Sequence, residues 1–246
     1  KAAMKRPLSK VEKDRMIVLF ISFILVIVFW GAFEQAGGLM NIYASEKTDR
    51  MLMGWEVPAS WFQSLNAMFI IILGTSVAAY WAHRKLKGKV STSLFKMCIG
   101  LIIMGTGFFF MTAAAAQFNS DGASAMYWLV LAYLFHTVGE LCLSPVALSY
   151  ITKLAPLKYA SLMMGVYFAM TGFGNKVAGL LGESASDLGE YTVFTGIAVF
   201  CVAFGLLVLL IRKKLEKLTH GAEDNERELH DNEPFELADP EINKTN

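Results

Sequence analysis

The chain has 246 residues, of which 55% are hydrophobic and only 17% carry a formal charge, and its net charge is +1. Together with a mean hydropathy of +0.46, this composition excludes an ordinary soluble domain and is typical of a polytopic membrane protein. The three cysteines, Cys98, Cys142 and Cys201, each stand alone in an apolar run. Such isolated cysteines indicate neither a disulfide framework nor a metal site.

Six apolar runs are long enough to cross a hydrocarbon core about 30 Å thick. An open strand cannot satisfy its backbone in lipid, so we expect six helices and an all-α membrane protein. In chain order the expected transmembrane segments are 16–43, 58–82, 94–116, 126–154, 159–181 and 191–211. We expect residues 1–14 to form a cytoplasmic lead-in, residues 15–216 the six-helix bundle, and residues 217–246 a disordered acidic cytoplasmic tail.

Basic residues are distributed unevenly among the connections between these segments. Lysine and arginine cluster before the first segment, after the second, after the fourth and after the sixth. The opposite connections carry only Lys47 and Arg50. This pattern predicts that both termini are cytoplasmic. The chain begins with lysine and no signal peptide precedes the first apolar run, so we expect it to be a piece of a longer polypeptide.

Several classes of chemistry have no motif in this sequence. There is no Walker A loop, dinucleotide-binding glycine fingerprint, His/Cys metal cluster or nucleophile elbow. We therefore expect no ATP-driven step, no cofactor, no metal and no nucleic-acid partner. We also expect that the protein is not an enzyme, because no nucleophile and base present themselves together.

A carboxylate stands inside the fourth segment, in the run GELCLSP. Glu140 lies about fourteen residues, or about 21 Å of helix path, from the start of that segment. An ionised group in hydrocarbon costs roughly 3 kcal/mol on insertion scales, so Glu140 either ties helices together or belongs to a polar cavity. His136 and Ser144 flank it at four-residue spacing. His136 is either a proton relay or an interhelical hydrogen bond, and Pro145 is expected to kink the helix.

Two further polar residues are expected at membrane depth. Asn66 lies among aromatic residues on the second segment, and its amide needs either a neighbouring helix or a substrate as partner. Glu34 shares a helix face with Trp30 near the outer boundary of the first segment. It is either a charge at headgroup level or half of an external gate.

The fifth segment combines aromatic residues with a stripe of glycines. Tyr167 and Phe168 lie near mid-depth, where an aromatic pair can wall a site for an amphipathic ligand. Gly165, Gly172 and Gly179 recur at seven-residue spacing, and the segment also carries Gly174 and Gly182. A stripe of this kind predicts a close approach to a neighbouring helix.

These motifs together resemble one known family. The runs FEQ at 33–35, WFQSLN at 61–66, GELCLSPVALS at 139–149 and MMGVYF at 163–168 are similar to those of proton-coupled oligopeptide transporters, a branch of the major facilitator superfamily. The resemblance covers about residues 14–215. It implies that the six helices are helices seven to twelve of a twelve-helix fold, and thus the carboxy-terminal half of a bacterial di- and tripeptide transporter of the inner membrane.

The resemblance also assigns roles to individual residues. It implies that Glu140 binds the amino terminus of the peptide and takes part in proton coupling, with Asn66 sharing that role. It implies that Glu34 pairs with a cation of the opposite bundle in a proton-linked gate. The residues implied to line side-chain pockets are Ser144, Trp30, Tyr167 and Phe168. Tyr167 stands where the family commonly has tryptophan, and Ala67 where proline often follows the asparagine, so the pocket shape is expected to differ.

The expected partners follow from the same resemblance. They are a di- or tripeptide, protons whose gradient supplies the energy, the lipid bilayer, and an amino-terminal six-helix bundle that holds the peptide carboxylate. The main hypothesis is proton-coupled peptide symport by alternating access, in which this chain binds the peptide amino terminus. The alternatives are a major facilitator carrier of another substrate, such as nitrate or a drug, and a non-transporting channel or scaffold subunit.

Overall fold

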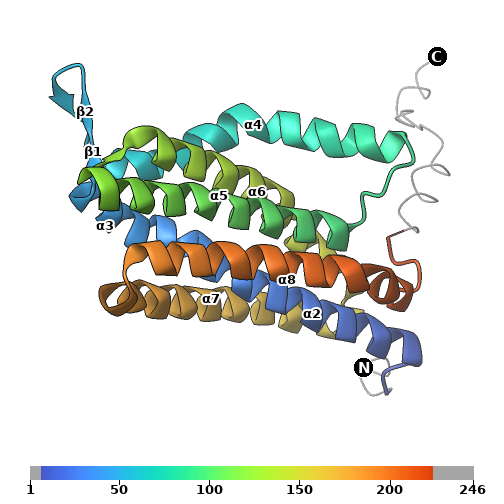
Figure 1. The fold of residues 1–246 in the computed structure, drawn as a ribbon. Helices are drawn as coiled ribbons and strands as arrows, with labels where there is room; N and C mark the ends of the chain where they lie inside the picture. Colours follow the sequence, from blue (N-terminus) through green and yellow to red (C-terminus); the bar gives the residue numbers. More distant parts are fainter. Residues whose placement is uncertain (1–6, 224–246) are drawn as a thin grey trace, which may run out of the picture.

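The computed structural model describes residues 7–223, so residues 1–6 and most of the expected acidic tail, residues 224–246, lie outside the described residues. In the described part, long helices run side by side as a bundle (Figure 1). They are α2 (Lys10–Phe33), α4 (Ser60–Leu86), α5 (Ser93–Asp121), α6 (Met126–Leu154), α7 (Ala160–Leu188) and α8 (Glu190–Leu218). At about 1.5 Å per residue, each is long enough to cross a bilayer core.

Five helical segments of the described chain are both long enough and apolar enough to cross a membrane, and α7 is not among them. It is as long as its neighbours, with 29 residues. Its glycines, together with Asn175 and Lys176, lower its hydropathy. The six expected segments therefore correspond to six long helices, one of which is more polar than a typical lipid-exposed span.

The first expected segment is not one continuous helix, contrary to the prediction from its hydropathy. Helix α2 ends at Phe33, a 3-10 turn η1 (Glu34–Ala36) follows, and a short helix α3 (Leu39–Glu46) resumes. The consecutive glycines 37 and 38 explain the break, because Gly38 has a non-helical backbone (φ −104°, ψ −106°) and glycine has a low helix propensity. Glu34 lies at this interruption.

Neighbouring helices hold the interruption in place. The buried Gln35 donates from Nε2 to the carbonyl oxygen of Gly31, at 3.2 Å, and to that of Ala178 on α7, at 3.0 Å. From α6, the Tyr133 hydroxyl donates to the Ala36 carbonyl oxygen at 3.1 Å. The turn that carries Glu34 is thus fixed from two sides.

Short strands lie at one end of the bundle (Figure 1). Strand β1 (Thr48–Asp49) pairs in parallel with β4 (Ser124–Ala125), and β2 (Met51–Leu52) pairs antiparallel with β3 (Trp55–Glu56). At this end Lys47 Nζ lies 2.6 Å from Glu190 Oε1, which joins the segment after α3 to the start of α8. At the opposite end, a 3-10 turn η2 (Leu157–Tyr159) connects α6 to α7.

Helix α5 packs closely against α6 through facing glycines. A Cβ added to Gly139 would lie 2.7 Å from the carbonyl oxygen of Gly100, and the converse distance is also 2.7 Å. Gly139 directly precedes Glu140 in the sequence. This close contact therefore fixes the depth and rotation of the helix that carries the carboxylate.

The glycines at seven-residue spacing on α7 (Ala160–Leu188) make no comparable close contact with a neighbouring helix. No atom of a neighbouring helix in the described chain lies within 4 Å of a Cβ built on Gly165, Gly172 or Gly179. The contact is made instead by Gly174, whose Cβ would lie 2.7 Å from Trp30 Cβ on α2. The expected close approach therefore occurs at one of the two additional glycines and not at the seven-residue stripe, because spacing identifies a common face of a helix but not the neighbour that the face meets.

Exchanging Gly139 for alanine is expected to destabilise the bundle. The added methyl group would overlap the Gly100 carbonyl, and overpacking of this kind costs about 1–3 kcal/mol of the free energy of unfolding. Thermal unfolding of the purified chain in detergent measures the effect. The matched variant Gly165→Ala adds the same methyl group to open space and is expected to retain the parental unfolding temperature. Equal behaviour of the two variants would contradict this account of the α5–α6 contact.

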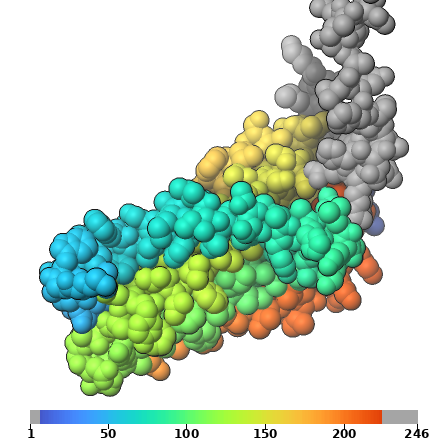
Figure 2. All heavy atoms as spheres, turned by 90° about the horizontal axis from the view of Figure 1, so that it is seen from above, coloured from blue at the N-terminus to red at the C-terminus, as the bar shows by residue number. Residues whose placement is uncertain are grey.

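Helix α4 lies along one edge of the bundle, apart from α5 (Figure 1). Seen from above, it forms a continuous exposed ridge (Figure 2). Only 6% of the most apolar 18-residue stretch of α4 is buried. The contacts of α4 with the rest of the bundle are mainly with α6. The polar residues of α4 are therefore accessible on one side and adjacent to α6 on the other.

Candidate functional site

The Glu140 carboxylate lies where α6 meets α4. Asn66 donates from Nδ2 to Glu140 Oε2 at 2.8 Å and lies 3.2 Å from Thr137 Oγ1. Asn66 and Glu140 are half-buried, whereas Thr137 is fully buried. We call these three residues the Asn66–Glu140 cluster. The structure thus brings together the two residues to which the sequence assigned a shared role.

Thr137 belongs to this cluster but was not predicted. Its hydroxyl donates to the Tyr133 carbonyl oxygen of its own helix at 2.7 Å, so the oxygen remains able to accept from Asn66. The available signal was its position three residues before Glu140, which places both residues on one helix face. Thr137 orients the amide that in turn holds the carboxylate.

Three of the expected pocket residues meet at the junction of α2, α6 and α7. The buried Tyr167 interacts with the side chains of Trp30 and Ser144. The Trp30 indole nitrogen is buried and forms no hydrogen bond of acceptable geometry in the described part of the chain. This junction is therefore a close contact and not a hydrogen-bonded network.

The two adjacent aromatic residues Tyr167 and Phe168 of α7 have different environments. Tyr167 is only 3% exposed, whereas Phe168 is 62% exposed. Their rings are nearly perpendicular, with centroids 5.5 Å apart. Of this pair, only Phe168 offers a free aromatic surface to a ligand in this conformation.

His136 does not take part in the Asn66–Glu140 cluster. It is buried, and neither ring nitrogen has a hydrogen-bond partner among residues 7–223. Its ring packs on Phe108 of α5, with centroids 4.4 Å apart, and against Gly107. The expected interhelical hydrogen bond is therefore not formed, and no bonded chain connects His136 to Glu140 as a relay would require. The side chain of His136 therefore packs against α5 instead of joining the Asn66–Glu140 cluster.

Glu34 lines a pocket of about 320 Å³ between α7 and the interruption of the first segment. Asn175 and Gly179 contribute to the same pocket. Within the described residues no basic side chain lies within 4.0 Å of the Glu34 carboxylate.

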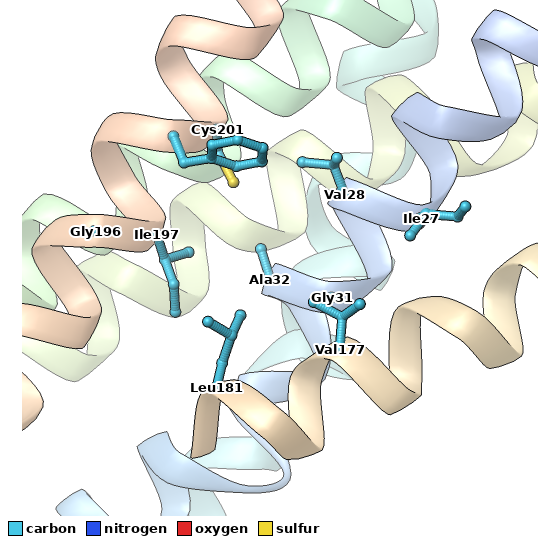
Figure 3. Close-up of a pocket in the computed structure, with 10 residues that line it drawn as sticks. Ile27, Val28, Gly31, Ala32, Val177, Leu181, Gly196, Ile197 and Cys201 are labelled. Carbon is cyan, nitrogen blue, oxygen red and sulfur yellow. The ribbon is translucent and has the colours of Figure 1, made fainter. Parts of the chain in front are cut away.

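A separate pocket of about 310 Å³ lies between α2, α7 and α8. Figure 3 shows that its walls are aliphatic side chains such as Val28, Val177, Leu181 and Ile197, around glycines 31 and 196. It has no charged group to hold either terminus of a peptide. Nor does any group of three potential metal ligands occur within the described part of the chain. The polar cluster, and not this cavity, is the candidate site.

The sequence also matches a known family. The sequence pattern described as "PTR2: POT family" matches residues 3–194. The chain belongs to the POT family. It is 36% identical over 222 residues to the peptide transporter YePEPT of Yersinia enterocolitica, a match covering 87% of this chain and 43% of that protein. It is 28% identical over 218 residues to a di-/tripeptide transporter of Lactococcus lactis, covering 85% and 43% of the two chains.

Solved POT structures share the fold. A peptide transporter POT in complex with sulfate has a TM-score of 0.80 at 30% identity, covering 87% of this chain and 43% of that one. A POT family transporter in complex with a thioalcohol-conjugated peptide has a TM-score of 0.77 at 26% identity, covering 87% and 45%. The chain therefore spans less than half the length of its POT relatives. The predicted fold class, a six-helix half of a major facilitator fold in the membrane, is confirmed.

Proposed function

We propose that this chain is the carboxy-terminal half of a proton-coupled di- and tripeptide symporter, and that its Asn66–Glu140 cluster binds the peptide amino terminus. The observation that carries the proposal is the hydrogen bond of 2.8 Å from Asn66 to Glu140 across α4 and α6. It engages Oε2 and leaves Oε1 of the carboxylate as an acceptor. A peptide ammonium group has three donors and a positive charge, which matches that acceptor.

Proton coupling follows from the environment of the carboxylate. A bare charge at membrane depth is costly, so Glu140 is most stable when a proton or a cation neutralises it. The peptide ammonium group displaces the proton from Glu140. Symport requires that the displaced proton travels inward together with the peptide, so a second carboxylate must hold it, and Glu34 is proposed for that role. Release of the proton and the peptide toward the cell in the same cycle links the two fluxes, and no other energy source or cofactor is required by this scheme.

Glu34 is proposed as the outer gate. Its position at the break between α2 and α3 places a carboxylate where the backbone is not a continuous helix. The lack of a basic partner among residues 7–223 supports pairing with a cation on the other six-helix bundle. Such a pair closes the outer side while it holds and opens when Glu34 takes up a proton.

The remaining assignments complete the half-site. The residues proposed to line pockets for peptide side chains are Ser144, Trp30, Tyr167 and Phe168. The distribution of basic residues supports an inner-membrane protein with both ends of this chain in the cytoplasm.

An anionic substrate such as nitrate is disfavoured, because Glu140 and Glu34 would repel it. Competition of labelled dipeptide uptake by nitrate, drugs and unlabelled dipeptides tests this choice, and only the dipeptides are expected to compete.

The chain alone is expected not to transport. Alternating access moves one bundle against the other around a site at their interface, and the described chain supplies carboxylates for the peptide amino terminus but only one of the two bundles. Liposomes containing the chain alone should accumulate no more labelled dipeptide under a proton gradient than empty liposomes. The full-length transporter containing this chain is the positive control. Gradient-driven accumulation by the isolated chain would contradict the proposal.

A further inference from the structure

A second groove, of about 540 Å³, lies between α4 and α5, with α6 as its floor. Its walls are formed by Val77 and Tyr80 of α4, Ile99 and Ile103 of α5, and Val138 of α6. It contains no residue of the Asn66–Glu140 cluster. In this part of the bundle α4 has separated from α5 (Figure 1), so the groove lies at the periphery.

One end of the groove is cationic. Arg84 belongs to its lining, and its guanidinium lies 5.3 Å from the centroid of the Phe95 ring. Lys96 Nζ lies 5.6 Å from the centroid of the Trp81 ring, which also lines the groove. These contacts place two positive charges directly over the aromatic residues at the groove's end. We call the groove and this end together the cationic groove.

A polar pocket of about 260 Å³ continues from the cationic end, around the connection between α4 and α5. Lys85, Lys89 and Lys153 line it together with Lys96. Its two carboxylates already accept hydrogen bonds, Glu216 from Thr92 at 2.5 Å and Glu223 from the Ser93 backbone at 2.9 Å. Basic side chains outnumber carboxylates here, so the region attracts an anion.

We propose that the cationic groove binds an anionic phospholipid, with an acyl chain along the apolar walls and the phosphate at Arg84 and Lys96. An apolar groove at the periphery of a membrane bundle is filled by hydrocarbon at little cost. Tryptophan and tyrosine at one end are typical of the depth of lipid headgroups. Basic pockets between transmembrane helices bind anionic headgroups. The site is independent of peptide binding and faces the leaflet that the basic connections assign to the cytoplasm.

Lipid retention by the full-length transporter that contains this chain tests this site. The transporter is reconstituted in vesicles of equal parts phosphatidylglycerol and phosphatidylethanolamine and extracted in detergent, and its bound lipids are counted by native mass spectrometry. The unaltered transporter is expected to retain phosphatidylglycerol preferentially. The double variant Arg84→Gln/Lys96→Gln should lower that preference by about 25-fold, because each of the two basic residues contributes on the order of a fivefold preference. The double variant Lys213→Gln/Lys214→Gln removes the same charge from the exposed surface of α8 and should leave the preference unchanged.

A second variant tests the acyl-chain part without altering charge. Ile99→Trp fills the groove and should also reduce phosphatidylglycerol retention, whereas Leu207→Trp on the exposed face of α8 should not. Equal retention by the Arg84/Lys96 variant and the unaltered transporter would overturn the proposal, as would an equal loss in the Lys213/Lys214 control. Displacement of the lipid by inorganic phosphate, with no effect of Ile99→Trp, would also overturn it, because the site would then be one for a free anion.

Discussion

Replacing Glu140 by glutamine is expected to reduce proton-driven dipeptide uptake by the full-length transporter more than about 100-fold, since removing one partner of a buried charge pair costs about 3–5 kcal/mol. Glutamine retains the size of the side chain and can still meet Asn66. It can neither neutralise a peptide ammonium group nor release a proton. Uptake of labelled dipeptide into proteoliposomes under an imposed pH gradient measures the change.

Glu46→Gln serves as the control for that variant. Glu46 is an exposed carboxylate at the end of α3, so its replacement removes the same charge without touching the site and should leave uptake unchanged. Glu140→Gln must also reach the membrane in normal amounts, which quantitative detection of the purified protein establishes. Parental uptake by Glu140→Gln would remove Glu140 from the coupling mechanism.

Replacing Asn66 by leucine should lower uptake by about tenfold or more. The amide donates to Glu140 at 2.8 Å, and hydrogen bonds to charged groups contribute about 1.5–3 kcal/mol. Leucine has a similar volume but no donor, so the carboxylate loses the group that orients it. Initial rates over a range of dipeptide concentrations will show whether the loss lies in apparent affinity, as the proposed role in binding requires.

Gln63→Leu is the matched amide control for this second variant. Gln63 lies on the same helix but is exposed, and exposed substitutions usually change stability by less than about 0.5 kcal/mol. Its uptake should remain within about twofold of the parent. An equal loss in both variants would mean that the amides act through general properties of α4 and not through Glu140.

Much of this fold was predictable, because long apolar runs mark the helices and the few polar side chains within those runs stand out. The fourth segment was expected at 126–154, and α6 has those limits, because long apolar runs bounded by polar connections define helix ends clearly. Asn66 and Glu140 were singled out because polar side chains at membrane depth are costly and need partners. The hydrogen bond between Asn66 and Glu140 was not predictable, since the sequence of neither segment indicates which other helix it packs against.

Other features depended on three-dimensional contacts. The break after Phe33 was missed because hydropathy averages over a window, and glycines 37 and 38 count as apolar although they interrupt a helix. The side chain of His136 packs on Phe108 because Gly107 leaves room for it on α5. Only the position of α5 could reveal this. For the same reason, Gly174 and not the regular glycine stripe makes the contact with α2.

The most direct test of the central claim compares peptides with free and blocked amino termini. Binding of a dipeptide and of its N-acetyl derivative is measured on the full-length transporter and on its Glu140→Gln variant. If Glu140 receives the peptide ammonium group, acetylation should weaken binding strongly in the parent and hardly at all in the variant, because the interaction is already lost. The same penalty for acetylation in both proteins would show that the amino terminus binds elsewhere, which would contradict the account.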